Sequence, residues 1–174
     1  MISITIADIG HRPDQFSRYI EEVPDGDLHQ RLRESSALEG QLDLSRFRAI
    51  ATSAYAPGKW TVSGVLQHVI DTERVFAYRA LRFARGDKTH LPGFDENLFA
   101  ATAALSPRPF DEVIAELQVV RGSTIAMFAG FSREALLRRG TCSGIEIAVA
   151  SLGFAMVGHH RHHLRVLNER YASL

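Results

Sequence analysis

Four of the protein's eight histidines lie within five consecutive positions near its C-terminus, in the segment GHHRHHLRVLNERY (158–171). On a helical wheel, His159 and His163 fall one turn apart on an apolar stripe, whereas His160 and His162 fall near its two edges. Two imidazoles spaced i and i+4 can bind one metal ion from a single helix face. The alternative is a pair of core histidines whose nitrogens are satisfied by hydrogen bonds.

A third histidine favours the metal site. His68 lies beside the apolar stripe of another predicted helix, near Val65, Thr72 and Arg79. Three histidines would leave a coordination position open for water or substrate, as a catalytic metal requires. Such a ligand set suits zinc, nickel, iron or copper, and the order of affinities alone does not decide among them.

Other metal architectures lack their motifs in this sequence. There is no Glu-x-x-His, which the di-iron bundles use, and no His-Glu-x-x-His, which marks the common zinc proteases. The single cysteine, Cys142, excludes a multi-cysteine zinc site and a disulfide within the chain. We expect Cys142 to be a small buried thiol rather than a nucleophile.

Two acidic residues on the helix of His68 are candidates for a supporting role. Glu73 falls near the middle of the apolar stripe, and a buried carboxylate needs a partner, for which Arg121 and Arg161 are candidates. In a functional role, Glu73 would be a general base or would orient a metal ligand by a hydrogen bond. The commoner case is that such a residue is half of a structural ion pair. Asp71 points further outward, where it either faces solvent or accepts a hydrogen bond from a metal-binding histidine.

Three aromatic residues, Tyr55, Trp60 and Phe94, could form the wall of a substrate pocket. Aromatic side chains at helix junctions more often belong to the core, so the pocket is the less common outcome.

The elements that would position these residues are helices. Apolar spacing of about 100° per residue predicts helices from Asp25 to near Gly40, over 61–85, over 110–129 and over 145–170. Residues 1–24 form an irregular or partly helical lead-in, and residues 86–109 form a long connection with a short helical turn at 96–101. No segment predicts a confident strand. We therefore expect an all-α protein, a single four-helix bundle domain over 1–174 with a long connection after the second helix.

The balance of charged residues limits the kinds of macromolecule that the protein could bind. Lys and Arg together number 20, as do Asp and Glu, and this balance argues against a nucleic-acid binder and against a binder of anionic membranes. The N-terminus lacks a basic start followed by an apolar run, so it does not read as a secretory signal. A lone cysteine fits a reducing compartment, and we expect a cytoplasmic protein.

The sequence resembles the DinB-like superfamily of metal-binding four-helix bundles, which includes the YfiT-like proteins. The resemblance rests on three segments, YAPGKWTVSGVLQHVIDTERVFAYRALRFARGD (55–87), LPGFDENLF (91–99) and GHHRHHLRVLNERY (158–171). It combines a W-x7-H pattern with a late H-x3-H pattern. The ligands of the family correspond to His68, His159 and His163, whereas the family often has Glu where His160 stands.

This resemblance implies a divalent metal ion and a small-molecule substrate. We expect zinc or nickel as the metal, with iron as a further alternative. Some relatives are thiol S-transferases that use low-molecular-weight thiols such as bacillithiol or mycothiol, and others are regarded as metal-dependent hydrolases. A metal-binding or ligand-binding protein without turnover is the third alternative. Bundles of this kind often form homodimers, and the outward-facing Val75 and Tyr78 favour such pairing here.

Overall fold

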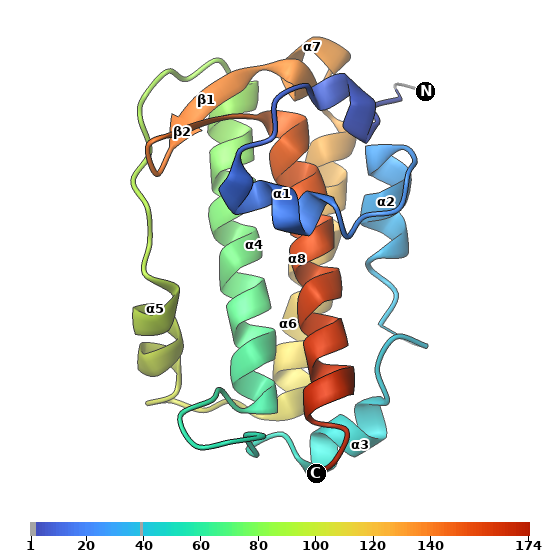
Figure 1. Ribbon diagram of the computed structural model, residues 1–174, viewed down its shortest axis with the longest axis vertical. Coiled ribbons are helices and arrows are strands. Elements are labelled where there is room, and N and C mark those ends of the chain that lie inside the picture. Colours follow the sequence, from blue (N-terminus) through green and yellow to red (C-terminus); the bar gives the residue numbers. More distant parts are fainter. Residues whose placement is uncertain (1–2, 39) are drawn as a thin grey trace.

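Three long helices form the frame of the molecule. The computed structural model describes residues 3–38 and 40–174, and it places α4 (Val62–Ala84), α6 (Phe110–Ala129) and α8 (Val149–Arg170) side by side (Figure 1). The much shorter α2 (Leu28–Glu34) packs against both α6 and α8 and is the fourth member. The predicted all-α four-helix bundle is therefore confirmed, although only three of its helices are long.

Side-chain caps explain where several helices begin. The hydroxyl of Thr61 accepts a hydrogen bond from the backbone N–H of Gly64 at 3.0 Å, and α4 starts at the next residue. Asp27 caps α2 in the same way through Gln30, at 3.1 Å. Thr61 is the residue at which the second helix was predicted to start, and Asp27 lies two residues after the predicted start of the first; Thr and Asp both satisfy the free N–H groups of a first turn.

The first bundle helix is shorter than predicted. It ends at Glu34, and residues 35–43 lead to a separate helix, α3 (Leu44–Ala49), capped by Asp43. The predicted end near Gly40 was wrong: the helix stops six residues earlier, where the hydroxyls of Ser35 and Ser36 donate hydrogen bonds to the backbone oxygens of Leu32 and Arg33. Residue 39 lies outside the described residues.

The lead-in is partly helical, as predicted, and it contributes to the core. It contains η1 (Ile6–Ile9), a 3₁₀ helix, and α1 (Asp14–Ile20), which crosses over α8 (Figure 1). Ile9, Phe16 and Ile20 are buried. α1 is therefore positioned to cover one side of the histidine-rich part of α8.

A small β-hairpin precedes α8 and corrects the expectation of no strand. β1 (Arg139–Cys142) pairs antiparallel with β2 (Ile145–Ala148). The two residues between them, Ser143 and Gly144, both have positive φ, 53° and 77°, as a type I′ hairpin turn requires. The last helix consequently begins at Val149 rather than Ile145, because residues 145–148 are extended.

The long connection after α4 contains α5 (Glu96–Ala103), where a helical turn was predicted, and α7 (Arg133–Leu137) follows α6. Leu91 joins the edge of the hairpin by two backbone hydrogen bonds, with Thr141 and Ser143. Within residues 3–38 and 40–174, no helix has both the length and the apolar character needed to cross a bilayer.

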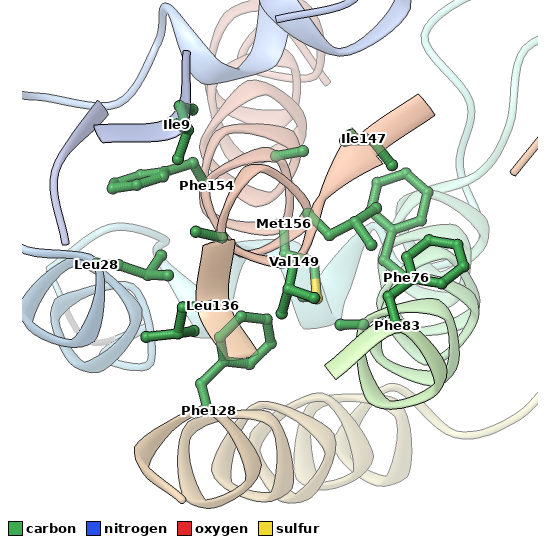
Figure 2. Packing of buried hydrophobic residues seen from close by; sticks show 14 of the residues in the cluster. Ile9, Leu28, Phe76, Phe83, Phe128, Leu136, Ile147, Val149, Phe154 and Met156 are labelled. Carbon is green, nitrogen blue, oxygen red and sulfur yellow. The ribbon is translucent and has the colours of Figure 1, made fainter. Parts of the chain in front are cut away.

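Buried apolar side chains form two clusters at different heights of the bundle. The cluster near the hairpin includes Phe76 and Phe83 of α4, Phe128 of α6 and Met156 of α8 (Figure 2). The other cluster surrounds the opposite ends of α4, α6 and α8. Between the two lies a layer of buried polar side chains, which we call the polar layer: Ser35, His68, Thr72, Glu73, Arg121, Thr124, His159 and His160.

Candidate metal centre

Helices α4 and α8 carry the three predicted metal ligands to one point in the polar layer. These two helices pack against each other along their length (Figure 1). His68 extends from α4, and His159 and His163 extend from adjacent turns of α8. The structure brings the predicted trio together. Among the histidine, cysteine, aspartate and glutamate side chains of the described residues, these three histidines are the group whose atoms lie close enough to hold one metal ion.

The Nε2 atoms of the three rings converge. The distance from His159 Nε2 to His68 Nε2 is 3.0 Å, and the distance from His159 Nε2 to His163 Nε2 is 3.1 Å. A ring nitrogen carries either one hydrogen or one lone pair, so His159 Nε2 cannot make two good hydrogen bonds at once. Nitrogens bound to one tetrahedral metal at about 2.05 Å lie about 3.3 Å apart, so a small shift of each ring fits the group to an ion.

All three imidazoles are held in the neutral form that a metal ligand needs. Burial lowers the pKa of His68 to about 4, despite the opposing effect of Asp71. Burial, followed by the neighbouring His68, lowers the pKa of His163 to about 3. Burial and the neighbouring histidines move the pKa of His159 well below 6.5. Protons therefore compete weakly with a metal ion at neutral pH.

Aromatic rings surround the trio. The indole of Trp60 lies 4.7 Å from the His68 ring, measured between ring centres, and the phenol of Tyr19 meets the His159 ring edge to face at 5.0 Å. A pocket wall was the less favoured alternative for Trp60, which lies beside the centre but does not line the pocket that reaches His159. Tyr55 instead packs on Tyr171, at 5.1 Å. Tyr19 was not predicted, because no periodic pattern connected the lead-in with α8.

A pocket of about 500 Å³ reaches the centre at His159. It lies between α1, α4 and the segment around Phe94, and Phe94 lines it, which was the less favoured of the two alternatives for this residue. Thr72, Phe76 and Arg79 line it from α4, at positions 4, 8 and 11 residues after His68. These spacings keep the residues on one helix face. A larger cavity, about 860 Å³, lies against α4 and α5, and the three histidines do not line it.

Glu73 forms a buried ion pair with Arg121 of α6, one of its two predicted partners. Arg121 Nε donates to Glu73 Oε1 at 2.9 Å, and Nη2 donates to Oε2 at 2.7 Å. Both side chains are at most 2% exposed. The other predicted partner, Arg161, donates instead to the backbone oxygen of Glu22. Because both carboxylate oxygens are engaged, Glu73 acts as half of a structural ion pair.

The remaining candidates stay outside the group of converging nitrogens. His160 is 1% exposed, and neither of its ring nitrogens has a hydrogen-bond partner among the described residues. Burial, with Arg121 nearby, moves its pKa well below 6.5. Asp71 accepts a hydrogen bond from Gln67 at 3.0 Å, and His162 lies 3.3 Å from a carboxylate oxygen of Glu22. Cys142 is buried, as predicted.

The comparisons with known proteins agree with the fold and identify the family. A similar solved structure is that of YfiT from Bacillus subtilis, described as a probable metal-dependent hydrolase with an unusual four-helix bundle topology. It is 18% identical, the match covers 94% of this chain and 91% of that one, and the TM-score is 0.58, which establishes a shared fold. No curated protein matches the sequence significantly. The DinB superfamily model matches residues 9–167, and the chain therefore belongs to the DinB superfamily.

Proposed function

We propose that this protein is a metal-dependent enzyme with a mononuclear three-histidine centre, and that it transfers a low-molecular-weight thiol to an electrophilic small molecule. One observation carries the proposal: three neutral imidazole nitrogens converge, and one of the three residues, His159, lines a pocket that is large enough for a small substrate. We expect zinc or nickel at the centre, with iron as a further alternative.

The charge of the ligand set favours a thiolate. His68, His159 and His163 are neutral ligands, and no carboxylate of the described chain hydrogen-bonds to any of them. A bound divalent ion would keep its full charge, and it would supply the Lewis acidity that lowers the pKa of a thiol. A thiol has an ordinary pKa near 8.5, so it needs no separate general base to ionise there.

The surrounding side chains orient the reactants and exclude water. Trp60 and Tyr19 cover the faces of His68 and His159, and Phe76 gives the pocket an apolar side. Cys142 is not the reacting thiol, because it is buried in the hairpin and burial raises the pKa of its thiol. The sulfur must therefore come from a second small molecule.

In the proposed reaction the thiol gives its proton to solvent, and its sulfur attacks an electrophilic carbon. A sulfur–carbon bond forms as the bond to the leaving group breaks, and the leaving group departs with its electron pair. The role of the chain is to hold both reactants in the pocket between α1 and α4, because a fixed approach replaces a collision in solution.

Hydrolysis is a second candidate. The hydroxyl of Thr72 lines the same pocket as His159, is buried, and has no hydrogen-bond partner among the described residues. It could hold a water molecule or the carbonyl oxygen of an ester or amide. The description of the similar YfiT structure as a probable metal-dependent hydrolase supports this alternative.

The test begins with metal analysis of protein purified without a histidine tag. The zinc-loaded and nickel-loaded proteins are then incubated with an electrophile such as monochlorobimane and cysteine, and separately with ester and amide substrates. We expect thiol transfer that requires the metal and is lost in His159→Ala. Hydrolysis without thiol transfer would establish the second candidate. Absence of both, with metal bound, would identify a binding protein without turnover.

A further inference from the structure

The pocket that reaches His159 also contains a buried arginine without an ionic partner. Arg79 is 3% exposed. Its Nη2 atom donates to the backbone oxygen of Pro92 at 2.8 Å and to the hydroxyl of Ser143 at 3.2 Å. Neither acceptor is charged, and Arg79 forms no ion pair with any carboxylate in residues 3–38 and 40–174.

A second buried arginine, Arg121, shows how this fold compensates a buried positive charge. Arg121 is 1% exposed and holds Glu73 through two of its nitrogens. A buried guanidinium is stable when an anion compensates it, and it is costly without one. Burial lowers the pKa of Arg79 below its ordinary value, which reflects this missing compensation. The fold supplies the counter-charge for Arg121 but not for Arg79.

Arg79 and His159 of the histidine centre both lie near the Phe76 ring, close enough for one small molecule to contact both. Its guanidinium carbon lies 5.8 Å from the ring centre of Phe76 and also 5.8 Å from that of Phe94. The Phe76 ring centre lies 6.5 Å from that of His159. A small molecule can therefore cross the Phe76 ring with one end at Arg79 and the other at His159.

The charged side chains around the pocket limit the net charge of an anion that could bind there. Asp14, Arg18 and Glu96 also line it, and Arg18 donates to the hydroxyl of Tyr19 at 2.6 Å. Two carboxylates near the same cavity disfavour a multiply charged anion such as phosphate. A monoanion such as a carboxylate fits better: Nη2 already donates to Pro92 and Ser143, and the Nε–H and Nη1–H groups remain to donate to carboxylate oxygens.

We propose that Arg79 binds the carboxylate of a small monocarboxylic substrate whose reacting group lies at the three-histidine centre. The second half of this statement rests on the proposed function, whereas binding of the carboxylate by Arg79 does not. Arg79 then selects the substrate and sets its direction in the pocket.

The experiment compares acids with their uncharged isosteres in two forms of the protein. Metal-free protein is titrated with propionate and with propionamide, and binding is followed by ¹⁵N NMR, including the Nε–H signal of Arg79. Cobalt-loaded protein is titrated with 3-mercaptopropionate and with 3-mercaptopropanamide, and binding is followed by the absorption of the cobalt–sulfur bond. We expect each acid to bind the parent about tenfold or more tightly than its amide.

Variants assign this preference to one residue. In Arg79→Gln the ratio of acid to amide affinity should fall to about one, and Arg79→Lys should keep part of it because the positive charge remains while the guanidinium donors are lost. Arg85→Gln removes an exposed arginine of the same helix end and should leave the ratio unchanged. If Arg79→Gln does not fold, the acid and amide comparison in the parent and the Nε–H shift still decide.

The outcomes separate the two proposals. Equal affinity for acid and amide in the parent, or an unchanged ratio in folded Arg79→Gln, would overturn the carboxylate site. Tighter binding of inorganic phosphate than of propionate would overturn the assignment to a monocarboxylate. Failure of the parent to bind cobalt would refute the metal centre alone, because the metal-free titration continues to test Arg79.

Discussion

Gly158 of α8 lies directly against the backbone of Tyr19 in α1. A Cβ atom at position 158 would lie 1.7 Å from the carbonyl oxygen of Tyr19, so the close approach of the two helices requires glycine at this point. Gly158 precedes His159, and the phenol of Tyr19 packs on the His159 ring. The contact therefore holds α1 over the candidate metal centre.

Gly158→Ala should move α1 away from α8 and lower the free energy of unfolding by about 1–3 kcal/mol, the usual cost of overpacking. Urea denaturation measures this change. The control is Gly122→Ala in α6, where an added Cβ meets nothing within 4 Å, and which should raise stability by about 0.5–1 kcal/mol. Equal stability of the two variants would show that α1 does not pack as described.

Single alanine variants of His68, His159 and His163 should each weaken zinc or nickel binding by more than about a hundredfold, because loss of a direct ligand exceeds the loss of a group that only orients one. Isothermal titration calorimetry measures the affinities. His162→Ala and His29→Ala, which remove histidines outside the trio, should bind as the parent does. Parent-like affinity of both His159→Ala and His163→Ala would place the site elsewhere.

Metal-free protein should lose stability as the pH falls below about 6.5. In the unfolded chain, histidines take up protons near this pH. In the fold, the pKa of His68 is about 4 and that of His163 is about 3, and the pKa values of His159 and His160 are also lowered. The unfolded state therefore binds more protons, and stability is lost progressively from about pH 6.5 down to the folded pKa values.

Within this window, each such histidine makes the free energy of unfolding fall by about 1.4 kcal/mol for each pH unit of acidification. Urea denaturation at pH 8, 7, 6 and 5 measures the total slope. His160→Phe removes one titrating group that has no hydrogen-bond partner among the described residues, so it should reduce the slope by one such increment. A slope that does not differ between His160→Phe and the parent would contradict the expected depression of its pKa.

Removing one partner of the Glu73–Arg121 pair should cost about 3–5 kcal/mol, because the remaining charge stays buried. We expect this loss for Glu73→Gln, and a much smaller one for the double variant Glu73→Leu with Arg121→Met. The exposed pair of Arg48 and Asp111 is the control, and Asp111→Ala should cost less than about 1 kcal/mol. A denaturant titration of the set measures these losses, and similar losses at both pairs would disprove the distinction.

The parts of the fold and site that the sequence predicted are those with a local signal. The bounds of α4 and α6 followed from apolar spacing, and the trio of histidines followed from their positions on two helical wheels. The partner of Glu73 was narrowed to two arginines, because a buried carboxylate requires a counter-charge.

The missed parts depend on contacts between distant segments. The hairpin has strands of four residues, too short for an alternating pattern to be distinguished from the start of a helix. Tyr19 reaches His159 only because glycine at position 158 admits α1, and neither residue indicates this alone. The proximity of Thr72 and Arg79 to His68 was visible on the wheel, but the pocket that they share with α1 was not.

The division of the three histidines between two helices affects how a metal ion would be captured. His159 and His163 belong to one rigid helix, so they form a preorganised bidentate chelator that exists whatever the spacing of the other helices. His68 closes the chelate across 91 positions of the chain. We therefore expect the spacing of α4 and α8 to govern affinity, so that substitutions between these helices tune metal retention without altering a ligand. Occupancy of the centre would in turn slow hydrogen exchange in the middle of both helices.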